Sequence, residues 1–232
     1  MHPKIKHLCN SLAVLALFAG AANGGALLTD GNASIQGSKL FSGGNVLNQT
    51  LIASVEYAVY APGDFGTSVA LGLPALADPS GGAEYVYAYE IFNDVGGQLR
   101  VAALSIALNP GVITNIATNV SHAPGTPEAG LAPNAWTFIP IAVDPPSNVK
   151  WSYTVSPNLL TVGLHSDILL FTSPFGPTFL NASMTGGSAS SAPKAGDPAV
   201  LLPSPIPEPS TLVLSALAAG LLAAGYLRRR KV

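Results

Sequence analysis

Two histidines stand beside side chains that could take part in acid–base or nucleophilic chemistry. His165 lies in the sequence Leu164-His165-Ser166-Asp167, which sets a hydroxyl and a carboxylate next to an imidazole in a predicted turn, and His122 lies in a predicted loop. A hydrolase triad needs a nucleophile, a base and an orienting acid, and no Gly-x-Ser-x-Gly elbow is present to hold a serine. We interpret both histidines as turn residues and keep a secreted hydrolase as the least favoured alternative.

Three tyrosines at every second position, Tyr85, Tyr87 and Tyr89, could stack against the rings of a sugar. Successive side chains of a strand point to opposite faces, so all three would share one face. The same pattern is typical of a sheet face whose rings pack against neighbouring strands, and we favour that interpretation. Trp136 and Trp151 lie in apolar runs, which predicts a core position for both.

No motif for a metal or a cofactor is complete. Asp30-Gly31-Asn32 and Asp94 near Gly96-Gly97 could each lend an oxygen to Ca²⁺, but neither follows a full calcium-loop pattern. A His-Glu-x-x-His motif, a Cys-x-x-Cys motif and a phosphate-binding glycine loop are all missing. We therefore predict no metal, no cofactor and no catalytic residue, and we expect that the protein is not an enzyme.

The last 26 residues combine three parts: a rigid acidic tripeptide, an apolar run and a basic end. The prolines of Pro207-Glu208-Pro209 favour an extended backbone and oppose helix formation. The apolar run from 211 to 227 would span about 25 Å as a helix, slightly less than a ~30 Å hydrocarbon core. The positive-inside bias would keep four cations in the cytoplasm: Arg228, Arg229, Arg230 and Lys231.

This order of parts resembles the PEP-CTERM sorting tail of Gram-negative bacteria. Proteins with such a tail are substrates of exosortase, a membrane-embedded protease-transpeptidase that handles surface and matrix proteins. The resemblance implies that Pro207, Glu208 and Pro209 form the processing motif. It also implies two partners, an exosortase-like membrane protease and the inner membrane, which the chain would cross once and transiently. The alternative is a stiff linker ahead of a permanent anchor.

The first 26 residues predict a secretory signal peptide. Its basic start, apolar centre and small-residue end are Lys4 to His7, Leu8 to Phe18 and Ala19 to Ala26. Cleavage after Ala21 and cleavage after Ala26 fit equally well. Cys9 is the only cysteine and would leave with the signal, which excludes a disulfide framework in the exported body.

The charge of the chain is unevenly distributed. Between Leu27 and Leu202 there are four Lys and Arg residues against eleven Asp and Glu residues, a net charge of −7, although the whole chain carries only −2. The basic residues are concentrated near the two termini. The body therefore has no basic patch of the kind that binds nucleic acid, and we expect no nucleic-acid partner.

Short runs of β-branched and aromatic residues alternate with turn residues through the body, as in an all-β domain. Eight strands are predicted: 54–60, 84–92, 99–108, 112–120, 136–143, 149–155, 159–164 and 168–172. No capped helix pattern exceeds two turns, although 71–77 and 97–108 are ambiguous. We predict a mainly β protein with a single antiparallel β-sandwich or jelly-roll-like domain, an N-terminal signal peptide and a C-terminal transmembrane helix.

The predicted organisation has four parts: a signal peptide (1–26), a β-sandwich body (27–185), a Gly/Ser/Pro-rich linker (186–206) and the sorting tail (207–232). We expect an exported protein that is first anchored in the inner membrane and then reaches the cell surface or extracellular matrix as a structural component. The alternative is a carbohydrate-binding module with an exopolysaccharide partner. That alternative requires Tyr85, Tyr87 and Tyr89 to face solvent.

Overall fold

The computed structural model describes residues 26–65, 78–108, 118–123, 130–139, 148–186 and 200–205. A short helix, α1 (Ala26–Thr29), precedes the strands. The strands described are β1 (Ile35–Gly44), β2 (Thr50–Tyr60), β3 (Tyr85–Asn93), β4 (Val101–Ala107), β5 (Thr118–Ala123), β6 (Ala135–Ile139), β7 (Asn148–Ser152), β8 (Ile168–Ser173), β9 (Pro177–Gly186) and β10 (Val200–Pro205).

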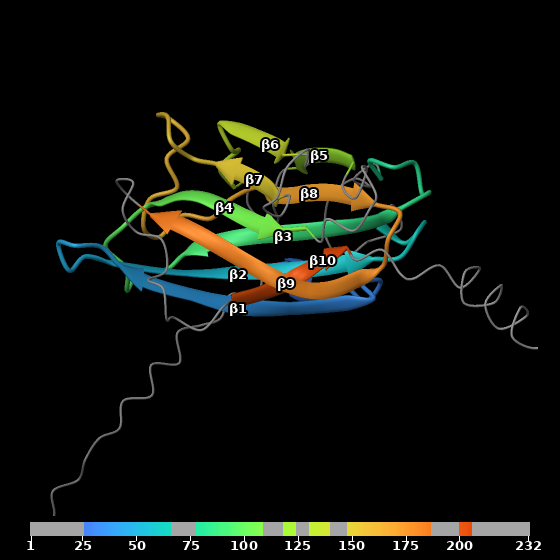
Figure 1. The fold of residues 1–232 in the computed structure, drawn as a ribbon, viewed down its shortest axis with the longest axis horizontal. Helices are drawn as coiled ribbons and strands as arrows, with labels where there is room; N and C mark the ends of the chain where they lie inside the picture. Colours follow the sequence, from blue (N-terminus) through green and yellow to red (C-terminus); the bar gives the residue numbers. More distant parts are fainter. Residues whose placement is uncertain are drawn as a thin grey trace, which may run out of the picture.

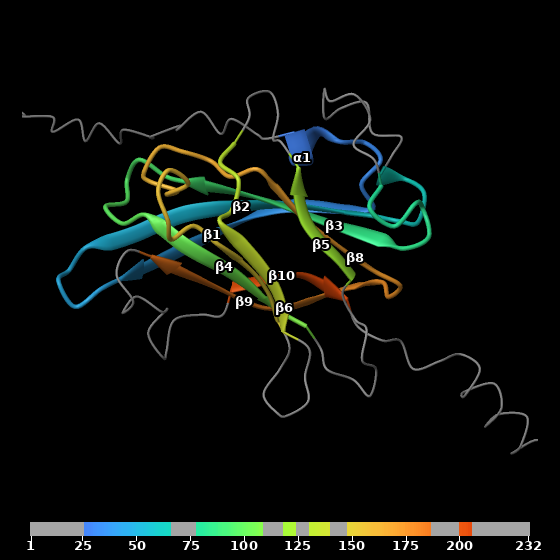
Figure 2. The ribbon, with the colours of Figure 1, turned by 90° about the horizontal axis from the view of Figure 1, so that it is seen from above.

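These strands form two five-stranded sheets, and every pair of neighbouring strands is antiparallel (Figure 1). The first sheet has the order β1-β2-β3-β8-β5, and the second has the order β10-β9-β4-β7-β6. The edge strands β1 and β10 contact each other, as do β5 and β6 at the opposite edges. The sheets therefore lie face to face as two layers, which Figure 2 shows from above.

The space between the sheets is filled by one apolar cluster. Alternation along β2 and β3 turns every second side chain toward this space, and the second sheet supplies the facing side chains. Its largest fully buried members are Tyr87, Tyr89, Ile91, Leu104, Ile106, Trp151, Tyr153 and Phe171. The rings of Tyr87 and Phe171 stack with their centroids 4.7 Å apart.

A second, smaller apolar cluster lies on the outer face of the first sheet, where Figure 2 shows α1. Leu27 of α1 is fully buried there against the outward-facing residues of the central strands. The remaining members are Ala58, Tyr60, Phe65, Val86, Ala88, Ala123, Ile168 and Leu170. The first sheet is therefore buried on both faces over much of its centre.

The prediction of a mainly β protein is confirmed, and the two antiparallel sheets are consistent with the predicted sandwich. Strand predictions overlap β2, β3, β4, β7 and β8, and they overlap the described parts of β5 and β6. The predicted strand at 159–164 is wrong. Leu160 makes only an isolated bridge with Val101, and the chain then turns through Gly163, whose φ of 84° places it in the left-handed region.

Three strands, β1, β9 and β10, were not predicted. β1 has a single buried residue, Phe41, and is rich in serine and glycine, and β9 alternates exposed and buried positions in its second half. β10 corrects part of the predicted linker, because Val200–Pro205 pairs with β9 and is therefore a strand of the body. Pro203 and Pro205 are tolerated there because β10 is an edge strand, whose outer side needs no ladder donors.

Several predictions lie outside the described residues. These are the signal peptide up to residue 25, the ambiguous segment 71–77, the apolar run 211–227 and the basic end 228–232. Within the described ranges, no helix has the length and apolar character needed to cross a membrane.

Candidate functional site

The chain that enters β8 contains a bulge beside the end of β3. Tyr89 pairs with Leu169, whereas Phe92 lies opposite His165. The three-residue step from Tyr89 to Phe92 therefore lies opposite a four-residue step from Leu169 back to His165. One extra residue on one side is the count expected of a β-bulge. The bulge shifts the alternation of side chains by one position, so residues 165–167 do not follow the inward–outward pattern of β8.

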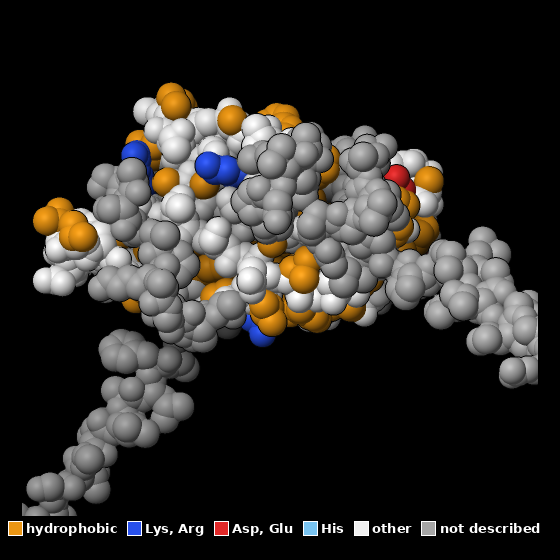
Figure 3. All heavy atoms as spheres, in the orientation of Figure 1, with side chains coloured by type: hydrophobic (Ala, Val, Ile, Leu, Met, Phe, Trp, Pro, Cys, Tyr) orange, Lys and Arg blue, Asp and Glu red, His pale blue; other side chains and the backbone are white. Residues whose placement is uncertain are grey.

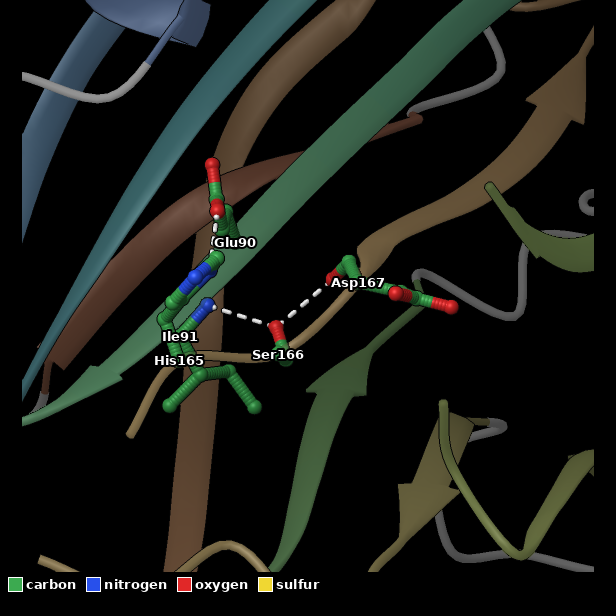
Figure 4. A network of polar contacts seen from close by, with 5 residues as sticks. All are labelled: Glu90, Ile91, His165, Ser166 and Asp167. Atoms are coloured by element: carbon green, nitrogen blue, oxygen red, sulfur yellow. Dashed lines mark hydrogen bonds and ion pairs between the residues drawn. The ribbon is translucent and has the colours of Figure 1, made fainter. Parts of the chain in front are cut away.

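Figure 4 shows the polar side chains that gather at this bulge. His165 Nδ1 lies 2.8 Å from Glu90 Oε1, and the imidazole ring stacks on Phe92. The Glu90 side chain is almost completely buried, whereas a quarter of the His165 side chain is exposed. The pair therefore joins a carboxyl in an apolar environment to an imidazole that reaches the surface.

A second carboxyl lies next to this pair. Glu56 of β2 is the register partner of Glu90, and both residues are buried. Burial raises the pKa of Glu90 to about 7, helped by the charges of Glu56 and Asp167, while the hydrogen bond and charge of His165 act in the opposite direction. Glu90 Oε2 has no hydrogen-bond partner among the described residues, which further favours the neutral acid.

This arrangement can hold and release one proton on Glu90 near neutral pH, beside the His165 ring at 2.8 Å. A nucleophile is not supplied by Ser166. Its hydroxyl donates to the Asp167 carbonyl at 2.7 Å and accepts from the Ile91 backbone N–H at 2.9 Å. The Ser166 hydroxyl therefore takes the place of a backbone carbonyl as the acceptor for the Ile91 N–H. The triad considered from the sequence is not assembled around Ser166.

The stacking platform is wrong for two of its three tyrosines. Tyr87 and Tyr89 are 0% exposed, and their hydroxyls donate to the carbonyls of Phe175 and Pro203. Only Tyr85 is partly exposed. The physical reason is that this face of β3 lies between the sheets, where burial also raises the pKa of Tyr89. Tyr85, Tyr87 and Tyr89 therefore do not form a three-ring surface for an exopolysaccharide partner.

The two tryptophans have different environments. Trp151 is 0% exposed in the main core, and its indole N–H donates to the Ser121 carbonyl, which confirms its predicted position. The core prediction for Trp136 is wrong, because this residue is 42% exposed. Trp136 lies on β6, the edge strand of the second sheet, where one partner strand covers less of a side chain.

The oxygens considered for Ca²⁺ serve the fold. Asp30 accepts from the Tyr60 hydroxyl at 2.8 Å and from the Asn32 backbone N–H at 3.0 Å. Asp94 is partly buried, and burial raises its pKa against the effect of a Ser54 hydrogen bond. Across the ranges that the structure describes, no group of three or more potential ligands is arranged to hold a metal ion. His122 pairs through its backbone with Leu169.

The pairing of Glu56 with Glu90 was missed by sequence reasoning. Alternation alone separates Glu90 from the tyrosines, but which residue of β2 lies opposite it depends on register. A usable signal was present: both glutamates lie inside long apolar strands, where a carboxyl is rarely left unpaired.

Comparison with known proteins adds one feature, at the other end of the chain. A family model described as the PEP-CTERM protein-sorting motif matches residues 205–231. The chain therefore carries this sorting motif, while the two-sheet body is assigned to no family. Neither the curated proteins nor the solved structures contain a match to the chain.

The sorting motif determines the route of the protein. It implies that the protein is exported, processed by exosortase, which is a membrane protein, and sorted to the cell envelope or surface. The match begins at Pro205, the last residue of β10, so the motif directly follows a strand of the second sheet. The residues predicted to form the processing motif, Pro207, Glu208 and Pro209, lie outside the described residues. The predicted basic stop, Arg228, Arg229, Arg230 and Lys231, also lies outside them.

Proposed function

We propose that the protein is a structural component of the cell surface or extracellular matrix, whose two-sheet body is placed there by its sorting tail. The observation that carries this proposal is the sorting motif at 205–231, which begins where the folded body ends. Tyr87 and Tyr89, two of the three tyrosines that would have formed a sugar platform, are core residues, and the Ser166 hydroxyl is held by backbone groups. The body is therefore assigned a structural role and no reaction.

The proposed route has a membrane-bound intermediate. The apolar run 211–227 holds the chain in the inner membrane, with the cations 228–231 in the cytoplasm and the body outside. An exosortase-like enzyme then cuts near Pro207-Glu208-Pro209. An apolar run slightly shorter than the bilayer core suits a temporary anchor, because its insertion is only weakly favourable.

Mass spectrometry of the surface-released protein tests this proposal. We expect a mature form that lacks residues 228–232, in cells that contain an exosortase. Glu208→Ala should slow processing and leave membrane insertion unchanged, because the apolar run and the basic end remain intact. Deleting 228–232 should instead reduce retention of the intermediate. A released protein that still carries Arg228 to Val232 would show that the tail is a permanent anchor.

The structural role is tested separately, by isolating the matrix from cells that produce the protein and from cells that lack it. We expect the mature body to fractionate with the matrix, in amounts comparable to those of the other matrix components. The Glu208→Ala variant should remain with the membranes. A body that stays freely soluble outside the cell after normal processing would contradict the structural role while leaving the sorting route intact.

A further inference from the structure

The sorting tail leaves the body at a defined end, which we call the tail pole. It consists of residues 61–64, 78–84 and 174–176 together with Pro205. The antiparallel pairing of β10 with β9 sets Pro205 beside Pro177, and the pairing of β3 with β8 sets Tyr85 beside Ser173. In Figure 1 this is the right-hand end, toward which the arrows of β8 and β10 point.

The loops of the tail pole contact each other and are acidic. A Cβ on Gly82 would come within 3.7 Å of the Gly63 Cα, and both glycines have a φ close to +90°, so these turns require glycine. Asp64, Asp78 and Glu84 lie in these loops, and no Lys or Arg lies within the three loop segments. Figure 3 shows the acidic atoms of the visible face at this same end.

The strand that leads into the tail is fastened to the core. Leu202 is fully buried, and the Ser204 hydroxyl donates to the Ala107 carbonyl at 2.7 Å. The Tyr89 hydroxyl crosses from the first sheet to donate to the Pro203 carbonyl. These contacts set the position of Pro205, so the tail begins at a fixed point on the tail pole.

Only five residues, 206–210, separate Pro205 from the apolar run that begins at Thr211. Six Cα-to-Cα steps reach at most about 20 Å. Proline at 205, 207 and 209 favours an extended backbone, so little slack is available. While residues 211–227 are in the bilayer, the tail pole therefore lies within about 20 Å of the hydrocarbon core, and the processing enzyme must work in that gap. The opposite end of the body is separated from the tail pole by the length of β2, about 35 Å for its 11 residues, and the tether does not hold it near the membrane.

We infer that the tail pole is a docking surface for the outer face of the exosortase-like membrane enzyme, which binds the folded body together with the sorting peptide. This inference rests on the proposed function, because it takes the membrane-bound intermediate as the substrate. The acidic loops fit an enzyme surface that carries positive charge. The body is processed with β10 in place, since the tail pole is close to the enzyme only while β10 holds Pro205 there.

A cross-link between β10 and β9 tests whether β10 stays in place. Asn181 and Leu201 are register partners, and both are exposed. The body contains no cysteine, so Asn181→Cys with Leu201→Cys can form one disulfide after export. Pulse-chase labelling of the full chain should show processing at the wild-type rate in the oxidised variant. Processing that stops until a reductant is added would overturn the inference, because β10 would then have to detach.

The contact between the tail pole and the enzyme is tested by lengthening the segment that joins Pro205 to the apolar run and by reversing a charge on the tail pole. Six Gly and Ser residues inserted between Pro205 and Ile206 leave the motif from 206 onward intact but remove the proximity, so processing should slow. Asp64→Lys should slow it about two- to fivefold, the range expected for an exposed charge contact. Val95→Lys, at an 84% exposed residue of the opposite end, should have no effect. Unchanged or faster processing of the insertion variant, or equal effects of the two lysines, would overturn the inference.

The melting temperatures of the released proteins verify that these variants fold. Failure of the inference is also distinguishable from failure of the proposed function. Loss of the Glu208→Ala effect, together with release of a form that keeps residues 228–232, would reject the sorting route. A normal Glu208→Ala effect combined with insensitivity to the insertion would reject only the docking surface.

Discussion

On one face of β3, Tyr87 and Tyr89 enter the apolar space between the sheets, whereas the other face carries Ala88 and Glu90. All four residues are buried, so the two faces differ in chemistry more than in exposure. The inner face satisfies its hydroxyls with backbone carbonyls and places its rings against Phe171. The outer face is mixed, because a small apolar cluster gives way to a carboxyl–imidazole pair.

One alternating strand therefore supports two kinds of interior in the same protein. The tyrosines of the inner face have pKa values raised above 10 by burial, so the contribution of this face to stability does not change between pH 4.5 and 7. The outer face makes stability depend on pH, since a buried carboxyl must stay neutral or find a partner.

Phe171→Ala should be strongly destabilising. Phe171 contacts Tyr87, Tyr89 and Trp151, so the truncation leaves a cavity in the middle of the main core. We expect a loss of about 3–5 kcal/mol in the free energy of unfolding, measured with denaturant. The matched control is Leu170→Ala, the neighbour on the outer face, which should lie near the lower end of about 2–5 kcal/mol. An equal or larger loss from Leu170→Ala would show that the smaller outer cluster contributes as much as the main core.

Glu90→Gln should remove a pH dependence. Burial raises the pKa of Glu90 from its ordinary value of 4.5 to about 7, so the native state binds this proton more tightly than the unfolded chain does. The stabilising contribution is therefore complete below about pH 4.5 and is lost as the pH rises through about 7. The wild-type melting temperature should fall across this window, and that of Glu90→Gln should fall less.

Tyr89→Phe on the inner face is the control for this pH profile. It removes a hydroxyl whose pKa lies well above 10, so the slope between pH 4.5 and 7 should match that of the wild type. A wild-type slope in the Glu90→Gln variant would assign the pH dependence to another group and would contradict the outer-face interpretation.

The same Tyr89→Phe substitution should also cost about 1–2 kcal/mol of stability, because the Pro203 carbonyl loses its donor inside the protein. The substitution should accelerate amide hydrogen exchange in β10 more than in the other strands. Tyr85→Phe, at a partly exposed ring of the same strand, should change stability by less than about 0.5 kcal/mol. Uniform exchange in β10 and β9 of Tyr89→Phe would show that the hydroxyl does not fasten β10.

Trp136→Ala should have a small effect, below about 1 kcal/mol, because much of this side chain is exposed on an edge strand. Trp151→Ala in the core should cost about 3–5 kcal/mol under the same conditions. Nearly equal losses of stability in Trp136→Ala and Trp151→Ala would show that the Trp136 side chain is covered more completely than its 42% exposure indicates.

Sequence patterns predicted the central strands well because long alternating runs have few competing structures. The strand at 84–92 was placed within one residue of β3, and the shared face of the tyrosines was correct. The missed strands have weaker patterns: β1 is polar, and β10 carries two prolines that normally oppose sheet formation. Their partners, β2 and β9, supply the pairing that their own residues do not specify.

The candidate site was predicted only in part. His165 was noted for its neighbours Ser166 and Asp167, yet its partner is Glu90, 75 residues earlier in the chain. A bulge brings them together, and it depends on how β3 and β8 pair. Chain order shows which groups are adjacent in sequence, whereas hydrogen bonds across a sheet depend on register.

The sequence by itself determined the route of this protein and the kind of structure it forms. A sorting motif is read as a linear order of residues, and strand alternation is a local property of the backbone, so both are visible without a fold. Only the tertiary structure decided which face of β3 became the main core, that Glu56 opposes Glu90 and that β10 holds the sorting tail. These features depend on contacts between residues far apart in the chain, and their energies exist only after the two sheets have packed together.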